Sequence, residues 1–173
     1  MSEQTQTGTG RGNNDSVQRR SKKTELKSAA AALPIGPYSQ GIQAGNFVFV
    51  AGEKGIDAKT GKLVPGGIAA ETRQTFENIE AILAEAGATL DDAVACTVHM
   101  TDLNEFQEMN RVYAEYFHET PPGRTTVQVA ALPGGAHIED HYHRGDLILS
   151  FAKNISDLEA LLHQSISERG ESG

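Results

Sequence analysis

The stretch Pro121–Glu139, PPGRTTVQVAALPGGAHIE, decides how the rest of the chain is interpreted. Residues 125–129 have the β-branched composition of a strand, and the Pro-Gly-Gly turn at 133–135 separates them from a second extended run. Arg124 begins the first run and Glu139 lies in the second. A guanidinium fork suits a substrate carboxylate, and a glutamate can orient or deprotonate a water molecule. Taken alone, each residue is also typical of an ordinary solvated strand end.

Length and charge restrict the class of protein. A chain of 173 residues suits one domain with a real core. Residues 1–28 hold six Lys or Arg and three Asp or Glu, a charge of +3, so the remainder carries -11 of the total of -8. An acidic body argues against broad nucleic-acid binding, which depends on neutralising phosphates. Residues 1–28 are polar and lack aromatic side chains, so we expect a disordered tail there.

The single cysteine, Cys96, excludes an intramolecular disulfide and fits a reducing compartment. It falls on the apolar side of an alternating run, which predicts a buried, inert thiol. No apolar run has transmembrane length, and no signal-peptide core follows Met1. We therefore expect a soluble cytoplasmic protein.

Hydrophobic periodicity predicts an α+β architecture with a mixed sheet covered on one face by two helices. Its elements are a hairpin of 41–43 and 47–51, a helix over 68–87, a strand over 93–102, a helix that opens at 102–105, a strand over 124–130 and an extended run from His137. We take 29–150 as the domain and 151–173 as a C-terminal extension, with a short helix predicted after a capping box at 156–159. His99, on the polar side of its strand, has no partner visible in the sequence.

Several motifs, in one order, resemble the RidA/YjgF family of reactive-intermediate deaminases between about Leu33 and Glu139. They are Gly36-Pro37-Tyr38-Ser39-Gln40, Gly45–Gly52, Glu71-Thr72-Arg73-Gln74 with Asn78, Thr101-Asp102-Leu103-Asn104, Asn110-Arg111-Val112-Tyr113 and Pro121–Val127.

The resemblance implies a chorismate mutase-like fold, assembled as a homotrimer with active sites between subunits. It also implies hydrolysis of small enamine and imine acids, such as 2-aminoacrylate and 2-iminobutanoate, to 2-keto acids and ammonia, with no cofactor and no metal. Carried over to this chain, Arg124 would bind the substrate carboxylate and Glu139 would position water. Tyr38 and Gly52 would line the pocket, and Asn110 would support it.

Two departures from the family pattern stand out. Ala51 and Glu53 replace a frequent Ser and Gln, which removes a polar contact and adds a charge. After Glu139 the family has an apolar strand, whereas this chain has Asp140-His141-Tyr142-His143-Arg144-Gly145-Asp146. Polar groups are thereby placed where a sheet interior is expected, at about 1–3 kcal/mol for each one left without a partner.

A frameshift near Glu139 is one hypothesis for this departure. Asp, His and Tyr codons, read one base later, give codons for Ile or Thr, so an apolar strand of the family pattern is hidden in the next frame. The nucleotide sequence of the locus from an independent isolate tests the idea. An uninterrupted frame through Gly173 would reject it.

Two alternatives from other functional classes remain open. His137, Glu139, His141 and His143 alternate, so on a strand they would share one face and suggest a metal site. A non-enzymatic or RNA-directed role is the other, since members of the family have been assigned ribonuclease, translation-inhibitor and chaperone-like activities, and the acidic body disfavours RNA. Metal analysis and an RNA cleavage assay separate these readings from deamination.

Overall fold

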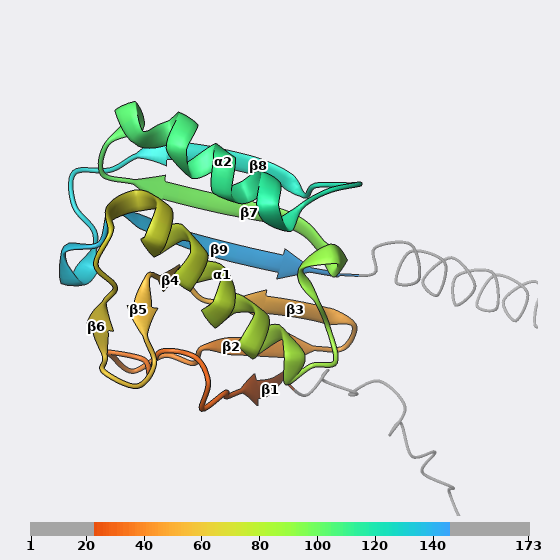
Figure 1. Ribbon diagram of the computed structural model, residues 1–173. Coiled ribbons are helices and arrows are strands. Elements are labelled where there is room, and N and C mark those ends of the chain that lie inside the picture. Colours follow the sequence, from red (N-terminus) through yellow and green to blue (C-terminus); the bar gives the residue numbers. More distant parts are fainter. Residues whose placement is uncertain (1–22, 146–173) are drawn as a thin grey trace, which may run out of the picture.

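The computed structural model describes residues 23–145, which form one sheet with two helices on the same face (Figure 1). The strand order is β1-β2-β3-β9-β7-β8, and β4 adds to β9. The bounds are β1 Lys23–Leu26, β2 Gly41–Ala44, β3 Phe47–Val50, β4 Glu53–Lys54, β7 Ala93–Met100, β8 Gly123–Gln128 and β9 Ile138–Arg144. Among the strands of residues 23–145, only β7 and β8 pair in parallel, so the sheet is mixed, as predicted. A separate hairpin joins β5 (Ile56–Asp57) to β6 (Lys62–Leu63).

Helices α1 (Gly67–Ala84) and α2 (Phe106–Tyr116) form where apolar side chains recur at spacings of three and four. Short 3₁₀ turns precede β7 at Leu90–Asp92, precede α2 at Leu103–Glu105 and precede β9 at Pro133–Gly135. Asp102 stabilises the entry to α2, because its side chain accepts a hydrogen bond from the Asn104 amide at 2.8 Å. The two predicted helices and the predicted hairpin are confirmed.

The core lies between the two helices and the sheet. Phe76 of α1 is its centre, since its ring contacts Tyr113 and Tyr116 of α2 at centroid distances of 4.8 and 4.3 Å. The aliphatic and thioether part of this core comprises Leu26, Val48, Val50, Ile68, Ile79, Ile82, Leu83, Leu90, Val98, Met100, Met109, Val112 and Ile138, with small alanines beside them. Cys96 is buried there as predicted, and burial raises the pKa of its thiol to about 12.

Strand β9 occupies the middle of the sheet and presents different chemistry on its two faces. It pairs with β7 from Met100↔Ile138 to Ala93↔Arg144, a register that includes His99↔Glu139, and it pairs with β4 at Lys54↔Glu139. Ile138, Asp140 and Tyr142 are buried beneath the helices, whereas the alternate residues Glu139, His141 and His143 lie on the open face.

Two of the polar residues expected in the sheet interior, Asp140 and Tyr142, are indeed buried there. Asp140 is 1% exposed; the Tyr113 hydroxyl donates to its Oδ2, but within residues 23–145 its Oδ1 and the Tyr142 hydroxyl have no partner. Burial raises the pKa of Asp140 to about 8, against the opposing effects of the Tyr113 hydrogen bond and the Arg124 charge. The strand therefore forms in spite of a buried, half-satisfied carboxyl group.

Three details differ from the sequence-based expectations. Lys23–Leu26, expected to belong to the disordered tail, is edge strand β1, because Leu26 is 4% exposed in the core and its backbone pairs with β2. Residues 53–54, which lie outside the strands expected from the sequence, are strand β4. Glu71, a charged residue within the predicted helix 68–87, is buried, and its carboxylate accepts a hydrogen bond from the His137 amide at 2.8 Å.

Residues 1–22 and 146–173 lie outside the described part of the chain, and with them lie the predicted C-terminal helix and the domain limit at 150. Among residues 23–145, no helix has both the length and the apolar character that a bilayer crossing requires.

Candidate active site

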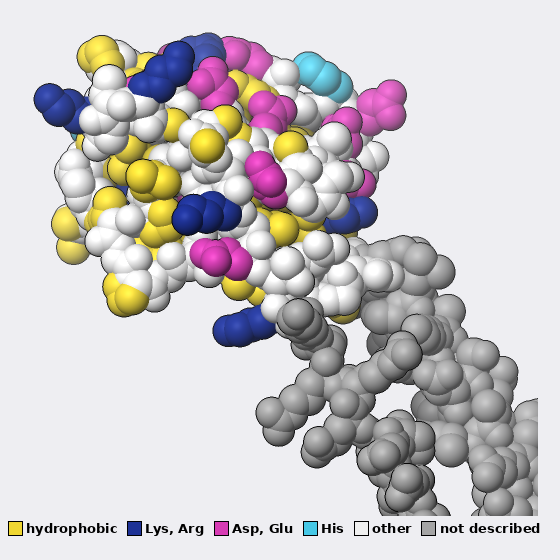
Figure 2. Space-filling model, turned by 90° about the horizontal axis from the view of Figure 1, so that it is seen from below, with side chains coloured by type: hydrophobic (Ala, Val, Ile, Leu, Met, Phe, Trp, Pro, Cys, Tyr) yellow, Lys and Arg dark blue, Asp and Glu magenta, His cyan; other side chains and the backbone are white. Residues whose placement is uncertain are grey.

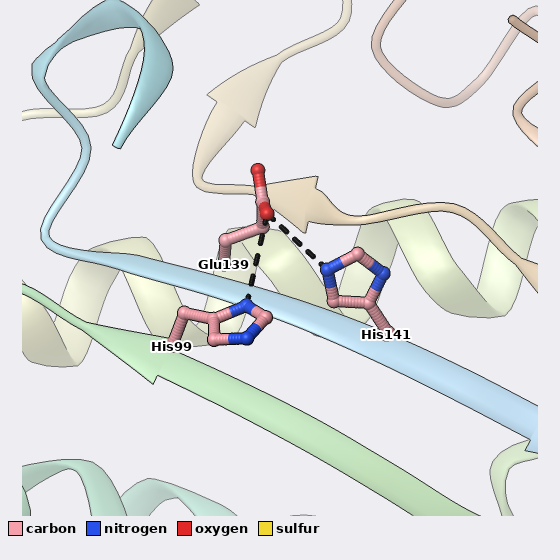
Figure 3. A group of neighbouring side chains, drawn as sticks. All are labelled: His99, Glu139 and His141. Atoms are coloured by element: carbon pink, nitrogen blue, oxygen red, sulfur yellow. Dashed lines mark hydrogen bonds and ion pairs between the residues drawn. The ribbon is translucent and has the colours of Figure 1, made fainter. Parts of the chain in front are cut away.

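Glu139 is the centre of a small polar cluster on the open face of the sheet. Its Oε2 atom lies 3.0 Å from Lys54 Nζ, and its Oε1 atom lies 3.2 Å from His141 Nε2. His99 Nδ1 is 3.9 Å from the same Oε1. Figure 3 shows the two imidazoles converging on the carboxylate, His99 from β7 and His141 from β9. Cross-strand pairing of His99 with Glu139 fixes this approach.

These neighbours keep the Glu139 carboxylate charged. The hydrogen bond with His141, followed by the hydrogen bond and charge of Lys54, lowers its pKa to about 2, although partial burial acts in the opposite direction. The group is therefore an anion throughout the neutral range. Such a weak base orients a water molecule and stabilises positive charge much better than it removes a proton.

Glu139 faces a pocket of about 320 Å³ that also contains Tyr38 and Gly52. The lining residues are Ile35, Tyr38, Ala51, Gly52, Lys54, Pro133, Glu139 and His141. A side chain at residue 52 would displace Glu139 and His141, because a Cβ there would lie 2.6 Å from Glu139 Cδ and 2.7 Å from His141 Cε1. The Tyr38 hydroxyl accepts a hydrogen bond from the Ile35 amide at 3.2 Å, which holds the ring near the pocket.

Glu53, the departure from the family pattern beside this pocket, is itself buried. Burial raises its pKa to about 7, although the Lys54 charge opposes that shift. The added carboxyl is thus partly protonated at neutral pH, and the charge expected there is smaller than the sequence suggests.

Arg124 and Asn110 form a second group, on α2 and β8. Arg124 Nη2 donates to Asn110 Oδ1 at 2.6 Å, and the guanidinium carbon lies 4.4 Å from the centre of the Tyr113 ring. This group borders a pocket of about 380 Å³ lined by Tyr113, Ala114, Phe117, Pro121, Pro122 and Arg124. Asn110, predicted to support the pocket, is in direct contact with Arg124.

A single chain does not bring Arg124 and Glu139 together. Arg124 is in register with Cys96, whose side chain points toward the helices, and its own contacts are with α2. Glu139 is in register with His99 and points to the opposite, open face. The two residues closest to the proposed chemistry thus lie on different faces of one sheet.

The alternative metal site made of His137, Glu139, His141 and His143 is wrong for two of its four residues, His137 and His143. The His137 ring contacts Glu71 at 2.7 Å, and His143 packs against the ring of Phe49 at a centroid distance of 5.4 Å. His99 takes their place, since the nearest ligand atoms of His99, Glu139 and His141 all lie within 4.8 Å of one another.

Sequence reasoning missed His99 and Lys54 as neighbours of Glu139. The alternation that placed His99 on the polar side of its strand was the available signal. Only the pairing of β7 with β9, and of β4 with β9, shows which partner each residue meets.

Comparison with known proteins agrees with this architecture. Residues 28–141 match the family model described as endoribonuclease L-PSP. A RutC family protein of Pyrococcus abyssi is 54% identical over 109 residues, which cover 63% of this chain and 86% of that protein. The 2-iminobutanoate/2-iminopropanoate deaminase of Bos taurus is 41% identical over 114 residues, covering 66% of this chain and 83% of the relative.

Among solved structures, Escherichia coli TdcF with bound serine is similar with a TM-score of 0.68 and 34% identity, over 71% of this chain and 98% of that one. The family match spans most of the described residues, and the relatives align over nearly their full lengths. The chain therefore belongs to the endoribonuclease L-PSP family, which is the RidA/YjgF family that its motifs resemble.

Proposed function

We propose that the protein hydrolyses small 2-imino and 2-enamine acids, such as 2-aminoacrylate and 2-iminobutanoate, to 2-keto acids and ammonia. The observation that carries the proposal is the Glu139 carboxylate, ionised at neutral pH, in a pocket with Tyr38 and Gly52. The deaminase name of the Bos taurus relative supports this reaction class. Serine, bound in the TdcF structure, has the α-carboxylate and α-nitrogen that such imines also carry.

The chemistry requires positioning more than a strong base. An enamine first tautomerises to the imine by taking a proton at C3 and losing one from nitrogen. Water then adds to the imine carbon, the resulting carbinolamine loses ammonia, and one water is consumed for each keto acid and ammonia formed. A protonated imine is already electrophilic, so the barrier falls mainly through orientation of the water and stabilisation of the cation. An anionic Glu139 supplies both, and no metal or organic cofactor enters these steps.

Arg124 is proposed to bind the substrate carboxylate. Its contact with Asn110 and the Tyr113 ring fixes the guanidinium, which lowers the entropic cost of forming a bidentate pair. Removal of such a partner leaves a carboxylate unpaired and costs on the order of 2–5 kcal/mol.

The proposed site requires a second copy of the chain, because Arg124 and Glu139 lie on opposite faces of one sheet. We propose a homotrimer in which Arg124 of one subunit and Glu139 of another face the same substrate. Sedimentation should give trimers, and dilution to monomers should abolish activity. Active monomers would contradict this arrangement.

Mixing two inactive variants gives a sharper test. When trimers are formed from equal amounts of Arg124→Ala and Glu139→Gln chains, about a quarter of random subunit interfaces carry both intact residues. Activity should return to about that fraction of the wild-type value. No recovery from verified mixed trimers would show that both residues act from the same chain.

RNA cleavage is the activity in the family model's own description, and it is tested alongside. Acidic and basic side chains are interspersed on the face shown in Figure 2, which does not resemble a continuous basic surface. We expect no cleavage of single-stranded or structured RNA by the purified protein.

A cytoplasmic location is proposed from the buried Cys96 thiol, and cell fractionation of the full chain tests it.

A further inference from the structure

The cluster around Glu139 has the composition of a metal centre, although the proposed reaction uses no metal. His99 and His141 each direct one ring nitrogen at the carboxylate, and the three ligand atoms lie within 4.8 Å of one another (Figure 3). Two imidazoles with one carboxylate suit zinc and the neighbouring first-row divalent ions. Calcium and magnesium prefer sets made wholly of oxygen ligands.

The position of Lys54 leaves one oxygen of Glu139 for an ion. Its ammonium group pairs with Oε2 at 3.0 Å, whereas both histidines approach Oε1. Lys54 also donates to the Gly52 carbonyl at 3.0 Å, so the partner that orients the carboxylate is itself held in place. The side chains of His99 and His141 are 28% and 32% exposed, so an ion can reach them from solvent.

The ligands stand on a rigid frame. His99 and Glu139 are directly paired across β7 and β9 in the middle of the sheet, and His141 follows two residues later on the same face. Ligands about 2.1 Å from a tetrahedral ion lie roughly 3.4 Å apart. His141 Nε2, at 3.2 Å, and His99 Nδ1, at 3.9 Å, are already close to that spacing from Glu139 Oε1.

We propose that His99 Nδ1, Glu139 Oε1 and His141 Nε2 bind one divalent transition-metal ion, with a remaining coordination position open to the pocket. Ligation occupies the oxygen that orients water in the proposed deamination. The ion is thus an inhibitor of that reaction. This consequence rests on the proposed function, whereas the binding itself does not.

Binding is tested on the full chain after treatment with a chelator and dialysis. Titration with Zn²⁺ in a calorimeter should give one ion per chain, and Co²⁺ should give the visible absorption bands of a low-symmetry site. His99→Ala and His141→Ala should each weaken Zn²⁺ binding by roughly 10- to 100-fold, at least as much as loss of an outer partner does. His143→Ala is the matched control, because His143 lies on the same face outside the three-residue group.

Far-UV circular dichroism confirms that each variant is folded before binding is compared. Saturable binding that is lost in His99→Ala and His141→Ala but kept in His143→Ala supports the site. Absence of saturable binding to the wild type, or equal weakening in all three variants, overturns it.

A separate assay tests the inhibitory consequence. Zn²⁺ should suppress imine hydrolysis by the wild type at the concentrations that saturate the site, and a chelator should restore it. Full activity with the ion bound would overturn the inhibition and leave the binding result intact. An inactive chelated protein that still binds Zn²⁺ would refute the deaminase proposal and support the metal site.

Discussion

Asp140→Asn should remove a large pH dependence of folding stability. The folded-state pKa of Asp140 is raised by burial from 3.8 to about 8. A group with a raised pKa contributes stability that is complete below its unfolded value and is lost as pH rises toward the folded value. The wild type should therefore lose stability between pH 5 and pH 8 through this residue.

The magnitude follows from about 1.4 kcal/mol for each pH unit over which the unfolded aspartate is ionised and the folded one is not. Between pH 5 and pH 8 this amounts to roughly 4 kcal/mol of unfolding free energy. An amide at position 140 does not titrate. The unfolding free energy of Asp140→Asn relative to that of the wild type should therefore rise by that amount between pH 5 and pH 8. Glu53, whose raised pKa acts in the same direction, is present in both proteins and cancels.

Urea denaturation at several pH values, followed by far-UV circular dichroism because the chain has no Trp, measures this difference. Asp91→Asn, at an exposed aspartate, serves as the control and should show no such trend. Wild type and Asp140→Asn that run parallel from pH 5 to pH 8 would refute the reasoning, because the carboxyl group would then have to reach water.

Three further outcomes are expected. Gly52→Ala should lower the rate of imine hydrolysis at least tenfold by displacing Glu139. Gly123→Ala is the control and should keep its rate, because the added Cβ meets only an ordinary contact at 3.7 Å. Equal activities of the two variants would show that the close approach at residue 52 is unimportant. Leu26→Ala should cost about 2–3 kcal/mol of unfolding free energy in denaturant titrations. An unchanged unfolding free energy would show that β1 does not contribute to the folded domain. Cys96 should react with a thiol reagent only after unfolding; rapid labelling of the native protein would contradict its burial.

The helices and the hairpin are predictable because their signals are local. Residues 68–87 carry a helical repeat of apolar side chains, and Ala44-Gly45-Asn46 supplies the turn between two strand-like runs. The structure places α1 at Gly67–Ala84 and pairs Gly41 through Ala44 with Phe47 through Val50. Tertiary packing changes these elements by only a few residues.

Strand pairing between distant residues is not predictable in the same way. The alternation in 93–102 shows that His99 is on the polar side, but the meeting with Glu139 depends on the register of β7 with β9. The pairing of β7 with β8 places Arg124 on the helix side, whereas the pairing of β7 with β9 places Glu139 on the open side. Edge strand β1 was missed because one buried leucine in a polar segment gives no periodic signal.

The most direct test of the central claim is release of 2-keto acid from freshly generated 2-aminoacrylate, measured with a chelator present so that no bound ion interferes. Wild type should accelerate release well above the spontaneous rate. Arg124→Ala and Glu139→Gln should each lose on the order of a hundredfold, while the exposed controls Arg111→Ala and Glu119→Gln keep full activity. A wild-type rate equal to the spontaneous rate, from folded trimeric protein, would contradict the claim.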